Sequence, residues 1–377
     1  MFKEQFDIYT WDEVKERIYS KTPADVERAI NKNSPDMDDF AALLSPAAEF
    51  YLENIAAKSH EMTRKRFGNT MQMYIPMYLS NECQNICTYC GFSLHNDIKR
   101  TTLTDEQILR EVEVIKSYGY DHILLVSGEA HRTVGTDYFK NAIRLIRPYF
   151  SNISMEVQPM ALDEYKVLAD EGVYAVLVYQ ETYNEEFYKD YHPKGKKSNF
   201  TYRLDTPDRL GKAGIHKIGL GVLIGLEDWR VDSWFCALHL QYLRKKYWQT
   251  KYSLSFPRLR PAVGYPDPKH IMNDKELVQL ICAYRLFDEN LELSLSTRET
   301  KTFRNNVIKL GITSISAGSK TDPGGYATGL HALEQFEISD DRSPAEIAEM
   351  IRNNGYEPVW KDWFYSVNSQ QLPVTTI

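Results

Sequence analysis

The feature of this sequence that most restricts its fold is a series of eight short β-prone runs, most of them separated by helical stretches. The runs cover residues 73–79, 122–127, 154–158, 175–179, 217–223, 252–257, 291–296 and 314–317. Strand–helix units in series favour an α/β fold with a parallel sheet, because each crossover must pack back on the sheet with the same hand. Eight such units predict a closed (β/α)8 barrel of the TIM type. An open, doubly wound sheet is the alternative, since the runs are unevenly spaced.

The segment that precedes these runs has the pattern of helices. Thr10, Thr22 and Ser45 each stand before a helical stretch as an N-cap, and two of them are followed by proline at the first helical position. We therefore predict an N-terminal helical extension over residues 1–70, followed by the barrel over residues 71–325.

The segment after the last β-prone run differs from the barrel units. It carries one capped helical stretch over residues 343–354, and its end is aromatic, with Trp360, Trp363 and Phe364. We expect residues 326–377 to form a C-terminal helical and aromatic segment that packs on the barrel and covers one of its ends.

Charge and cysteine content favour a cytoplasmic protein. The chain has 45 basic and 52 acidic residues and a formal net charge of -7, which does not favour nucleic acid or an anionic membrane as the main partner. Its first residues lack an apolar core of signal-peptide length, and no window approaches the apolar length of a membrane span. Five cysteines are an odd and sparse count that suits a reducing compartment. We expect Cys236 and Cys282, which lie in apolar helical runs, to be buried small side chains.

Three further cysteines, Cys83, Cys87 and Cys90, form a CxxxCxYC cluster. A 4Fe–4S cube has four irons, so three thiolates leave one iron open to a small molecule. The alternative is a structural zinc site in which His95 supplies the fourth ligand. Zinc sites usually pair their ligands in two separated knuckles, and this sequence has no second Cys/His cluster.

Polar residues stand just after the predicted strands, where the active sites of parallel α/β barrels lie. Besides the cysteines, these positions carry Ser127, Gly128, Glu129, Gln158, Gln180, Glu181, Glu227, Arg258, Arg260, Arg298, Glu299, Ser316 and Ser319. Any one of them alone is more often a loop residue or a helix cap. Their placement beside a cysteine cluster predicts one site at this end of the barrel.

The cysteine spacing resembles the signature of the radical S-adenosylmethionine (radical SAM) superfamily. The resemblance implies that Cys83, Cys87 and Cys90 hold a 4Fe–4S cluster whose open iron chelates the amino and carboxylate groups of SAM. It also implies that Tyr89, just before the third cysteine, and Phe92, just after it, line the adenine.

Other stretches resemble further SAM-binding positions of this superfamily. Ser127, Gly128 and Glu129 are similar to its GGE-type strand end, which binds the SAM amino group through backbone carbonyls; serine replaces the first glycine and leaves that backbone role intact. Glu181 resembles the acid that binds the ribose hydroxyls. Arg203 resembles the arginine that pairs with the methionine carboxylate, for which a guanidinium offers two parallel donors.

Runs along most of the chain resemble the 2-iminoacetate synthase family, the tyrosine lyases of bacterial thiamine thiazole biosynthesis. These runs are residues 67–70, 155–159, 178–183, 205–211, 255–261, 295–299 and 320–326. The resemblance implies cleavage of the Cα–Cβ bond of L-tyrosine to 2-iminoacetate (dehydroglycine) and 4-methylphenol (p-cresol), while SAM is converted to 5'-deoxyadenosine and methionine. It further implies thiazole synthase as a protein partner and a flavodoxin or ferredoxin as electron donor.

Two residues are our candidates for binding tyrosine. We expect Arg298 to hold the tyrosine carboxylate as a two-pronged clamp, although a structural ion pair with Glu299 or with another acid at the barrel mouth is an alternative. We expect Ser316 to orient the amino group, with Ser314 and Ser319 as competitors.

A third candidate, Tyr78, is expected to face the phenol or to relay protons, and Glu227 and Arg260 are its competitors for that role. These expectations depend on the family resemblance stated above. The spacing of the three residues in the sequence does not favour one of them over the others.

Other functions stay open at this point. A related tryptophan lyase is difficult to exclude from the sequence. The related tyrosine lyase that matures FeFe-hydrogenase carries a second cluster on a cysteine-bearing C-terminal extension, whereas no cysteine follows Cys282 here. From another class, a non-catalytic zinc or iron–sulfur scaffold protein would also carry the three clustered cysteines.

Overall fold

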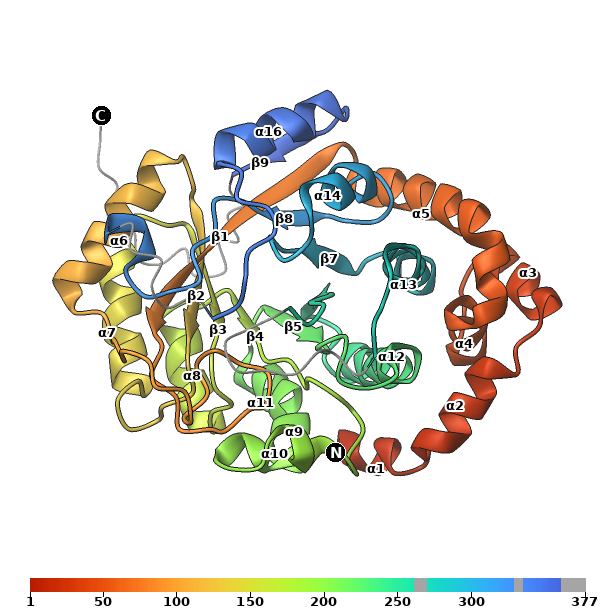
Figure 1. Ribbon diagram of the computed structural model, residues 1–377, viewed down its shortest axis with the longest axis horizontal. Helices are drawn as coiled ribbons and strands as arrows, with labels where there is room; N and C mark the ends of the chain where they lie inside the picture. Colours follow the sequence, from red (N-terminus) through yellow and green to blue (C-terminus); the bar gives the residue numbers. More distant parts are fainter. Residues whose placement is uncertain (261–269, 329–334, 361–377) are drawn as a thin grey trace.

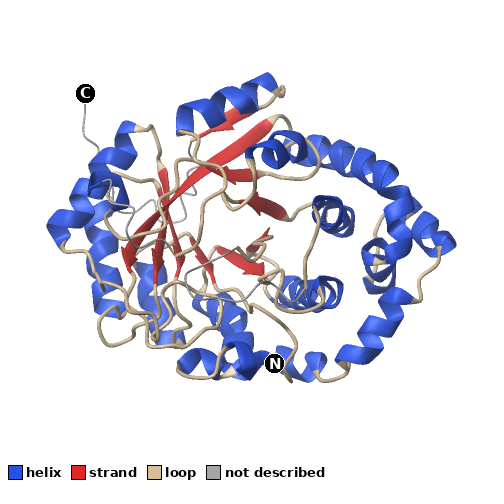
Figure 2. Ribbon diagram, in the orientation of Figure 1, coloured by secondary structure: helices blue, strands red, loops and turns tan. Residues whose placement is uncertain are grey.

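The computed structural model describes residues 1–260, 270–328 and 335–360. Eight parallel strands form a closed ring, because β1 (Thr70–Ser80) pairs with both β2 (His122–Ser127) and β8 (Ser314–Ser316). The other strands of the ring are β3 (Asn152–Glu156), β4 (Ala175–Leu177), β5 (Lys217–Gly221), β6 (Lys251–Ser255) and β7 (Glu292–Leu295). Helices surround this ring (Figure 2). The predicted (β/α)8 barrel is confirmed, and each of the eight β-prone runs overlaps one of its strands.

Strand register sets which residues reach the top of the barrel together. β2 and β3 pair from His122 opposite Asn152 to Val126 opposite Glu156. Because parallel strands end at the same edge of a sheet, the residues that follow them gather at one mouth. Close packing inside the ring also needs small residues: a Cβ atom at Gly221 would come within 2.9 Å of the Tyr179 ring.

The outer helices follow the strands in chain order. They are α6 (Asp105–Ser117), α7 (Thr136–Ile146), α8 (Leu162–Asp170), α11 (Thr206–Ala213), α12 (Trp229–Lys246), α13 (Asp274–Phe287) and α14 (Lys301–Val307). The predicted capping box of α6 is present, since the Gln107 N–H donates to Thr104 and the Gln107 side chain accepts from the Thr104 N–H. Cys236 and Cys282 are 1% and 0% exposed on α12 and α13, which confirms that they are buried.

The connection between β4 and α11 holds short helices that the sequence did not predict. These are α9 (Tyr188–Tyr191), η2 (Lys196–Ser198) and α10 (Phe200–Leu204). Each is five residues or shorter, too short for a clear helical period in the sequence. The connection carries Lys197 and Arg203 to the barrel mouth.

The N-terminal helices form an arc around α12 and α13 (Figure 1). The arc consists of α1 (Phe2–Phe6), α2 (Trp11–Tyr19), α3 (Pro23–Asn31), α4 (Met37–Leu44), η1 (Pro46–Tyr51) and α5 (Leu52–Phe67). The predicted caps at Thr10 and Thr22 are present. Phe2 stacks on His239 of α12 with a centroid distance of 3.8 Å, and the Trp234 indole N–H donates to the Met37 carbonyl at 3.0 Å. These contacts fix the arc to the outside of the barrel helices.

The C-terminal part adds α15 (Gly325–Thr328), α16 (Pro344–Asn353) and a short strand, β9 (Glu357–Val359). The helix expected near residues 343–354 is therefore present. The sequence did not predict β9, which pairs with the beginning of β1 through only three residues. Trp360 then packs edge-on against Tyr120, with a centroid distance of 5.2 Å. Trp363 and Phe364 lie outside the described residues.

A buried ion pair joins α14 to the chain before α16. Arg304 donates to Asp340, and both side chains are 0% exposed. Arg342 donates to the same carboxylate at 2.6 Å. Removing one partner of a buried ion pair is costly, so this cluster holds the C-terminal part against the barrel.

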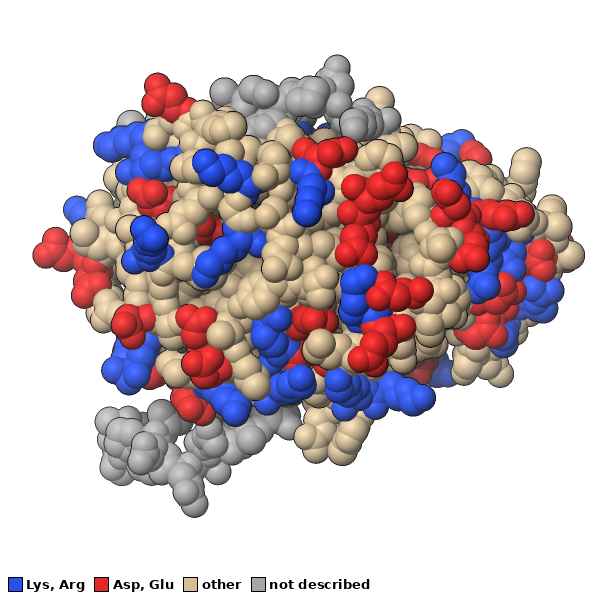
Figure 3. Space-filling model, turned by 90° about the horizontal axis from the view of Figure 1, so that it is seen from below, with Lys and Arg blue, Asp and Glu red and all other residues tan. Residues whose placement is uncertain are grey.

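Within the described ranges, no helix combines the length and the apolar character that a bilayer crossing needs. Acidic and basic side chains are interspersed on the face shown in Figure 3.

Candidate active site

Three cysteine thiols line one cavity at the barrel mouth, which we call the cysteine cavity. Cys83, Cys87 and Cys90 lie on the loop after β1, and none of the three forms a disulfide within the described residues. Burial, with Glu129 and Cys90 nearby, raises the pKa of the Cys83 thiol to about 11. Other residues that line this cavity are Phe92, Ser127, Gly128, Glu129, Glu156, Tyr179, Glu181, Lys197, Arg203 and Gln335.

The arrangement of the thiols fits a cluster better than a single ion. Among the described residues, no three His, Cys, Asp or Glu side chains converge closely enough to ligate one metal ion, and His95 is exposed. The three thiols nevertheless open on the same cavity. A four-iron cube is larger than one ion and binds one thiolate at each of three corners, so the donor set fits it.

Backbone approaches closely beside the cysteines at Gly128, which follows β2. Its N–H donates to the Ser80 carbonyl at 2.9 Å, and a Cβ atom there would lie 2.2 Å from the Glu82 carbonyl oxygen. Only glycine fits this position without moving the backbone of the cysteine loop. The Glu129 carbonyl accepts a hydrogen bond from the Gln84 N–H at 2.9 Å, and the buried Ser127 hydroxyl has no hydrogen-bond partner within the described residues.

Four charged side chains form a network on the wall of the cysteine cavity. Arg203 donates to Glu129 at 2.8 Å and lies 3.4 Å from Glu181, while Lys197 donates to Glu181 at 2.7 Å. Burial alone would raise the pKa of both carboxyls, but Arg203 and Lys197 outweigh it, and both pKa values are lowered. The two acids are therefore ionised acceptors. Lys197 was not a sequence candidate, because it stands in a basic loop like many exposed ones.

The backbone at Glu181 is unusual. Its φ is +72°, and it is the one residue other than glycine with positive φ within the described part of the chain. Its carbonyl accepts from the Leu223 N–H at 2.8 Å. Such a conformation costs on the order of 1 kcal/mol for a residue with a Cβ atom and is held by surrounding contacts. Here it directs the carboxylate toward Lys197 and Arg203.

The two aromatic residues near the third cysteine, Tyr89 and Phe92, line different cavities. Phe92 lines the cysteine cavity and packs edge-on against Tyr78, with a centroid distance of 5.9 Å. Tyr89 lines a second cavity, and its hydroxyl contacts His192 Nε2 at 2.6 Å. A shared role of the two rings at an adenine stays a prediction.

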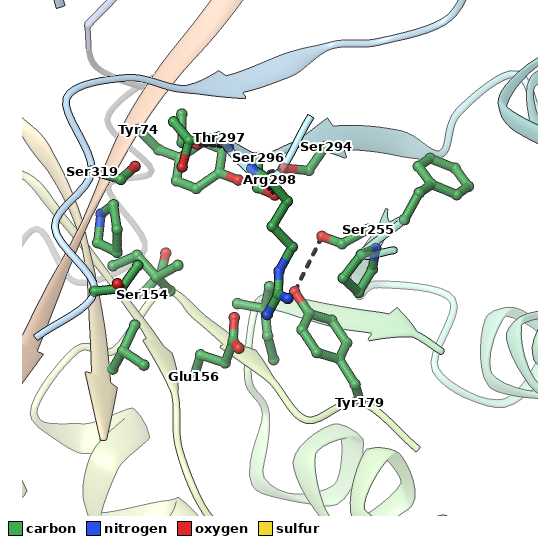
Figure 4. Close-up of a pocket in the computed structure, with 18 of the residues that line it drawn as sticks. Tyr74, Ser154, Glu156, Tyr179, Ser255, Ser294, Ser296, Thr297, Arg298 and Ser319 are labelled. Atoms are coloured by element: carbon green, nitrogen blue, oxygen red, sulfur yellow. Dashed lines mark hydrogen bonds between the residues drawn. The ribbon is translucent and has the colours of Figure 1, made fainter. Parts of the chain in front are cut away.

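This second cavity occupies the inside of the barrel, and we call it the Arg298 cavity. Arg298, Ser316 and Tyr78 all line it, so the structure brings the three tyrosine-site candidates together. In Figure 4 the Arg298 side chain extends from the end of β7 into the cavity, toward Glu156 and Tyr179. Several hydroxyl groups, among them Ser255, Ser294, Ser296 and Ser319, also line it.

The Arg298 guanidinium has no hydrogen-bond partner among the described residues. It stacks over the Phe336 ring at 3.3 Å from the centroid. The alternative pairing with Glu299 does not occur, because Glu299 accepts from Arg258 at 3.0 Å and from Arg260 at 3.2 Å. A guanidinium with open donors inside a cavity is suited to bind a carboxylate.

The hydroxyl of Ser316, at the end of β8, faces the same cavity. It accepts a hydrogen bond from the Thr297 N–H at 3.1 Å and is 2% exposed. Ser319 also lines the cavity, and its buried hydroxyl has no hydrogen-bond partner in the part of the chain that the structure describes. Both serines are therefore available to a ligand, and the choice between them stays a prediction.

Of the three candidates for the phenol, Tyr78 is the one whose side chain lines the Arg298 cavity. Its hydroxyl donates to Gln335 Oε1 at 2.8 Å. Glu227 instead accepts from Tyr191 and Asn184 outside this cavity, and Arg260 pairs with Glu299. Gln335 belongs to the C-terminal part and was not a sequence candidate.

Glu156, at the end of β3, lines both cavities and was not a sequence candidate either. Burial raises the pKa of its carboxyl to about 7, against a lowering by Arg298. A carboxyl that titrates near neutral pH inside a cavity is typical of a functional group. In the sequence it lies inside the predicted strand 154–158 and within one of the runs, 155–159, that carry the family resemblance.

The two cavities adjoin, since they share part of their lining. The shared residues are Cys90, Glu156, Leu177, Tyr179, Glu181, Lys197 and Gln335, together with Val126. A molecule held at the cysteines is thus in direct reach of one held by Arg298.

Known proteins are similar to this chain over nearly its whole length. The 2-iminoacetate synthase of Escherichia coli (strain K12) is 53% identical over 363 residues, which cover 96% of each chain. The enzyme of the same name from Salmonella typhimurium shows the same identity and coverage. The Radical SAM superfamily matches residues 77–234, and the Biotin and Thiamin Synthesis associated domain matches residues 255–357.

Solved structures agree with this relationship. The FeFe-hydrogenase maturase HydG from Carboxydothermus hydrogenoformans superposes with a TM-score of 0.89 at 28% identity, covering 97% of this chain and 86% of that chain. Methylornithine synthase (PylB) shares the fold, with a TM-score of 0.71 at 19% identity, over 89% of this chain and 97% of that chain.

Proposed function

The chain belongs to the 2-iminoacetate synthase family of radical SAM enzymes, and we propose that it cleaves the Cα–Cβ bond of L-tyrosine. The products are 2-iminoacetate and 4-methylphenol, with SAM converted to 5'-deoxyadenosine and methionine. The observation that supports this most is the joining of the cysteine cavity to the cavity that holds the open Arg298 guanidinium. It gives one place for SAM and an adjacent place for an amino acid.

The cysteine cavity holds the cofactors in this proposal. Cys83, Cys87 and Cys90 would hold a 4Fe–4S cluster, and the cluster with SAM would supply the one-electron chemistry that starts the reaction at the tyrosine amine. Glu181 binds the ribose hydroxyls of SAM, and Arg203 binds its carboxylate.

The backbone after β2 and two aromatic rings complete the SAM site. Ser127, Gly128 and Glu129 face the SAM amino group, and the absence of a Cβ atom at Gly128 keeps this backbone close to the cysteine loop. Phe92 and Tyr89 flank the adenine. These roles come from the family and are consistent with the lining of the two cavities.

The Arg298 cavity holds tyrosine. Arg298 grips the carboxylate, Ser316 orients the amino group, and Tyr78 contacts the substrate ring from β1. Glu156 faces Arg298 and accepts a proton from the tyrosine ammonium at its carboxylate oxygen, so that the amine is neutral when it gives up a hydrogen atom. Enclosure by the barrel keeps water from the reactive intermediates.

The proposal extends to location and partners. None of the five cysteines, all of which lie in the described residues, forms a disulfide, which suits the reducing cytoplasm. A flavodoxin or ferredoxin supplies the electron, and thiazole synthase receives the unstable imine; both partners are family expectations.

Product analysis with two amino acids tests the function. The anaerobically reconstituted protein is given SAM and a reductant, with tyrosine, tryptophan or neither. We expect 4-methylphenol and glyoxylate, the hydrolysis product of 2-iminoacetate, with tyrosine alone. Turnover of tryptophan in preference to tyrosine would point to the related tryptophan lyase, and no 5'-deoxyadenosine under any condition would point to a scaffold protein.

A further inference from the structure

One side chain touches both the substrate cavity and a cluster ligand. The Gln335 amide accepts a hydrogen bond from the Tyr78 hydroxyl at 2.8 Å through Oε1, and its Nε2 donates to Cys90 Sγ at 3.7 Å. Gln335 lines both cavities. The three residues come from β1, the cysteine loop and the C-terminal part, so only the folded chain brings them together.

The backbone fixes Gln335 in this place. Its carbonyl accepts from the Gly91 N–H at 3.2 Å, next to Cys90, and its own N–H donates to the Thr321 carbonyl at 3.1 Å. The side chain is therefore anchored at its base and restrained at its tip. A thiolate only accepts hydrogen bonds, so the amide nitrogen must face Cys90 and the amide oxygen must face Tyr78.

Cys90 receives a hydrogen bond from the Gln335 side chain in addition to one from the Phe92 backbone N–H. Backbone N–H groups of Asn85 and Glu129 serve Cys83, and they cannot be changed without moving the loop. Gln335 serves Cys90 with a side chain whose orientation depends on Tyr78. Hydrogen bonds to ligating sulfurs withdraw negative charge from the cluster and raise its reduction potential.

We propose that Tyr78 and Gln335 form a hydrogen-bond relay that raises the reduction potential of the cluster at Cys90, and raises it further when tyrosine fills the Arg298 cavity. A bound tyrosine restricts the Tyr78 ring, which lines this cavity, and so holds the Gln335 amide in its donating orientation. The cluster then accepts an electron from its low-potential protein donor more readily when substrate is present. SAM is thereby spared when the cavity is empty. Gln335 is a positioning residue in this account, and the inference rests on the proposed function.

The experiment measures potentials rather than turnover. The full chain is reconstituted anaerobically, its iron content is determined, and the midpoint potential of the one-electron cluster couple is followed by EPR during dithionite titration, with and without saturating tyrosine. We expect a higher potential with tyrosine in the wild type. Gln335→Met lowers the potential and removes the response to tyrosine, and Gln335→Glu lowers it further because a carboxylate cannot donate and adds negative charge.

Two further variants distinguish loss of the hydrogen-bond relay from a nonspecific structural change near the cluster. Tyr78→Phe leaves Gln335 in place but frees its amide, so we expect a smaller decrease of the potential and loss of the tyrosine response. Glu337→Gln changes an exposed residue of the same segment that lines neither cavity and leaves the donor in place, and its cluster potential should equal that of the wild type.

Equal potentials in the wild type and both Gln335 variants overturn the relay, as does an unchanged tyrosine response in Tyr78→Phe. If one Gln335 variant loses its iron, the cluster potentials of the other Gln335 variant and of Tyr78→Phe test the relay. Absence of iron in the wild type itself refutes the proposed function, and the relay falls with it; a relay that fails alone leaves the wild-type EPR signal and product formation intact.

Discussion

On the wall of the cysteine cavity, four charged side chains are already paired with one another, whereas in the adjoining Arg298 cavity the guanidinium has no hydrogen-bond partner among the described residues. Arg203 and Lys197 share Glu129 and Glu181 in the first case. In the second, Arg298 only stacks over Phe336. The difference indicates that one region is preorganised by internal ion pairs and that the other keeps its charge open for a ligand. The four predictions below test this difference.

The largest effect is expected at the cysteines. Cys87→Ala removes one of three thiolates, and the cluster should then be lost together with all SAM cleavage, because two thiolates do not hold a cube in an open site. Iron content and the broad visible absorbance of the reconstituted protein measure this. Cys282→Ala, at a buried cysteine far from the cavity, is the control and should keep its iron. A fully active Cys87→Ala enzyme would refute the ligand assignment.

Removing a charge from the paired network on the wall of the cysteine cavity should lower the stability of the protein. Arg203→Met leaves Glu129 and Glu181 short of one partner in a buried place, and we expect a decrease of about 3 to 5 kcal/mol in the free energy of unfolding of the metal-free protein. Urea denaturation measures it. The matched control is Arg144→Met, which breaks the exposed pair with Glu171 and should cost less than about 1 kcal/mol. Equal losses in both variants would contradict a preorganised network.

Removing the open charge of the Arg298 cavity should weaken the binding of tyrosine. Arg298→Ala should weaken tyrosine binding by about 2 to 5 kcal/mol, the range for removing the partner of a buried charge. Cluster content should not change, since Arg298 lies in the other cavity. Calorimetric titration with tyrosine measures the affinity. Arg298→Lys keeps the charge without the two-pronged geometry and should recover only part of it. An unchanged affinity in Arg298→Ala would assign this residue a structural role.

The smallest effect concerns Glu156, between the two regions. Its carboxylate form accepts the proton, and its pKa is about 7, so tyrosine-dependent SAM cleavage should rise as pH increases through about 7. Glu156→Gln should lower the rate by about 10²-fold and remove this dependence. Rates measured between pH 5.5 and 8.5 give the profile. A Glu156→Gln enzyme that keeps the wild-type pH profile would exclude the carboxylate as the base.

The features that could be predicted from the sequence are those that produce a pattern among residues close together in the chain. Strands between helices leave β-prone runs, and Cys83, Cys87 and Cys90 lie within a single loop, so both were visible without coordinates. β9 was missed because three residues give no period, and its pairing with β1 joins distant parts of the chain.

The missed site residues share a similar cause. Glu156 looks like any acid at a strand end until its burial is known, and Lys197 stands in a basic loop. Gln335 reaches Cys90 from a segment 245 residues away in sequence. Residues whose role depends on contacts between distant parts of the chain produce no local sequence pattern. Arg298 and Ser316 were predicted because of the resemblance to a family.

The most direct test of the account counts iron and products together. The anaerobically reconstituted chain should hold four irons and, given SAM and reductant, should form 5'-deoxyadenosine and 4-methylphenol in equal amounts when tyrosine is present. Protein that holds a single zinc ion, or that forms 5'-deoxyadenosine without any 4-methylphenol in the presence of tyrosine, would contradict it.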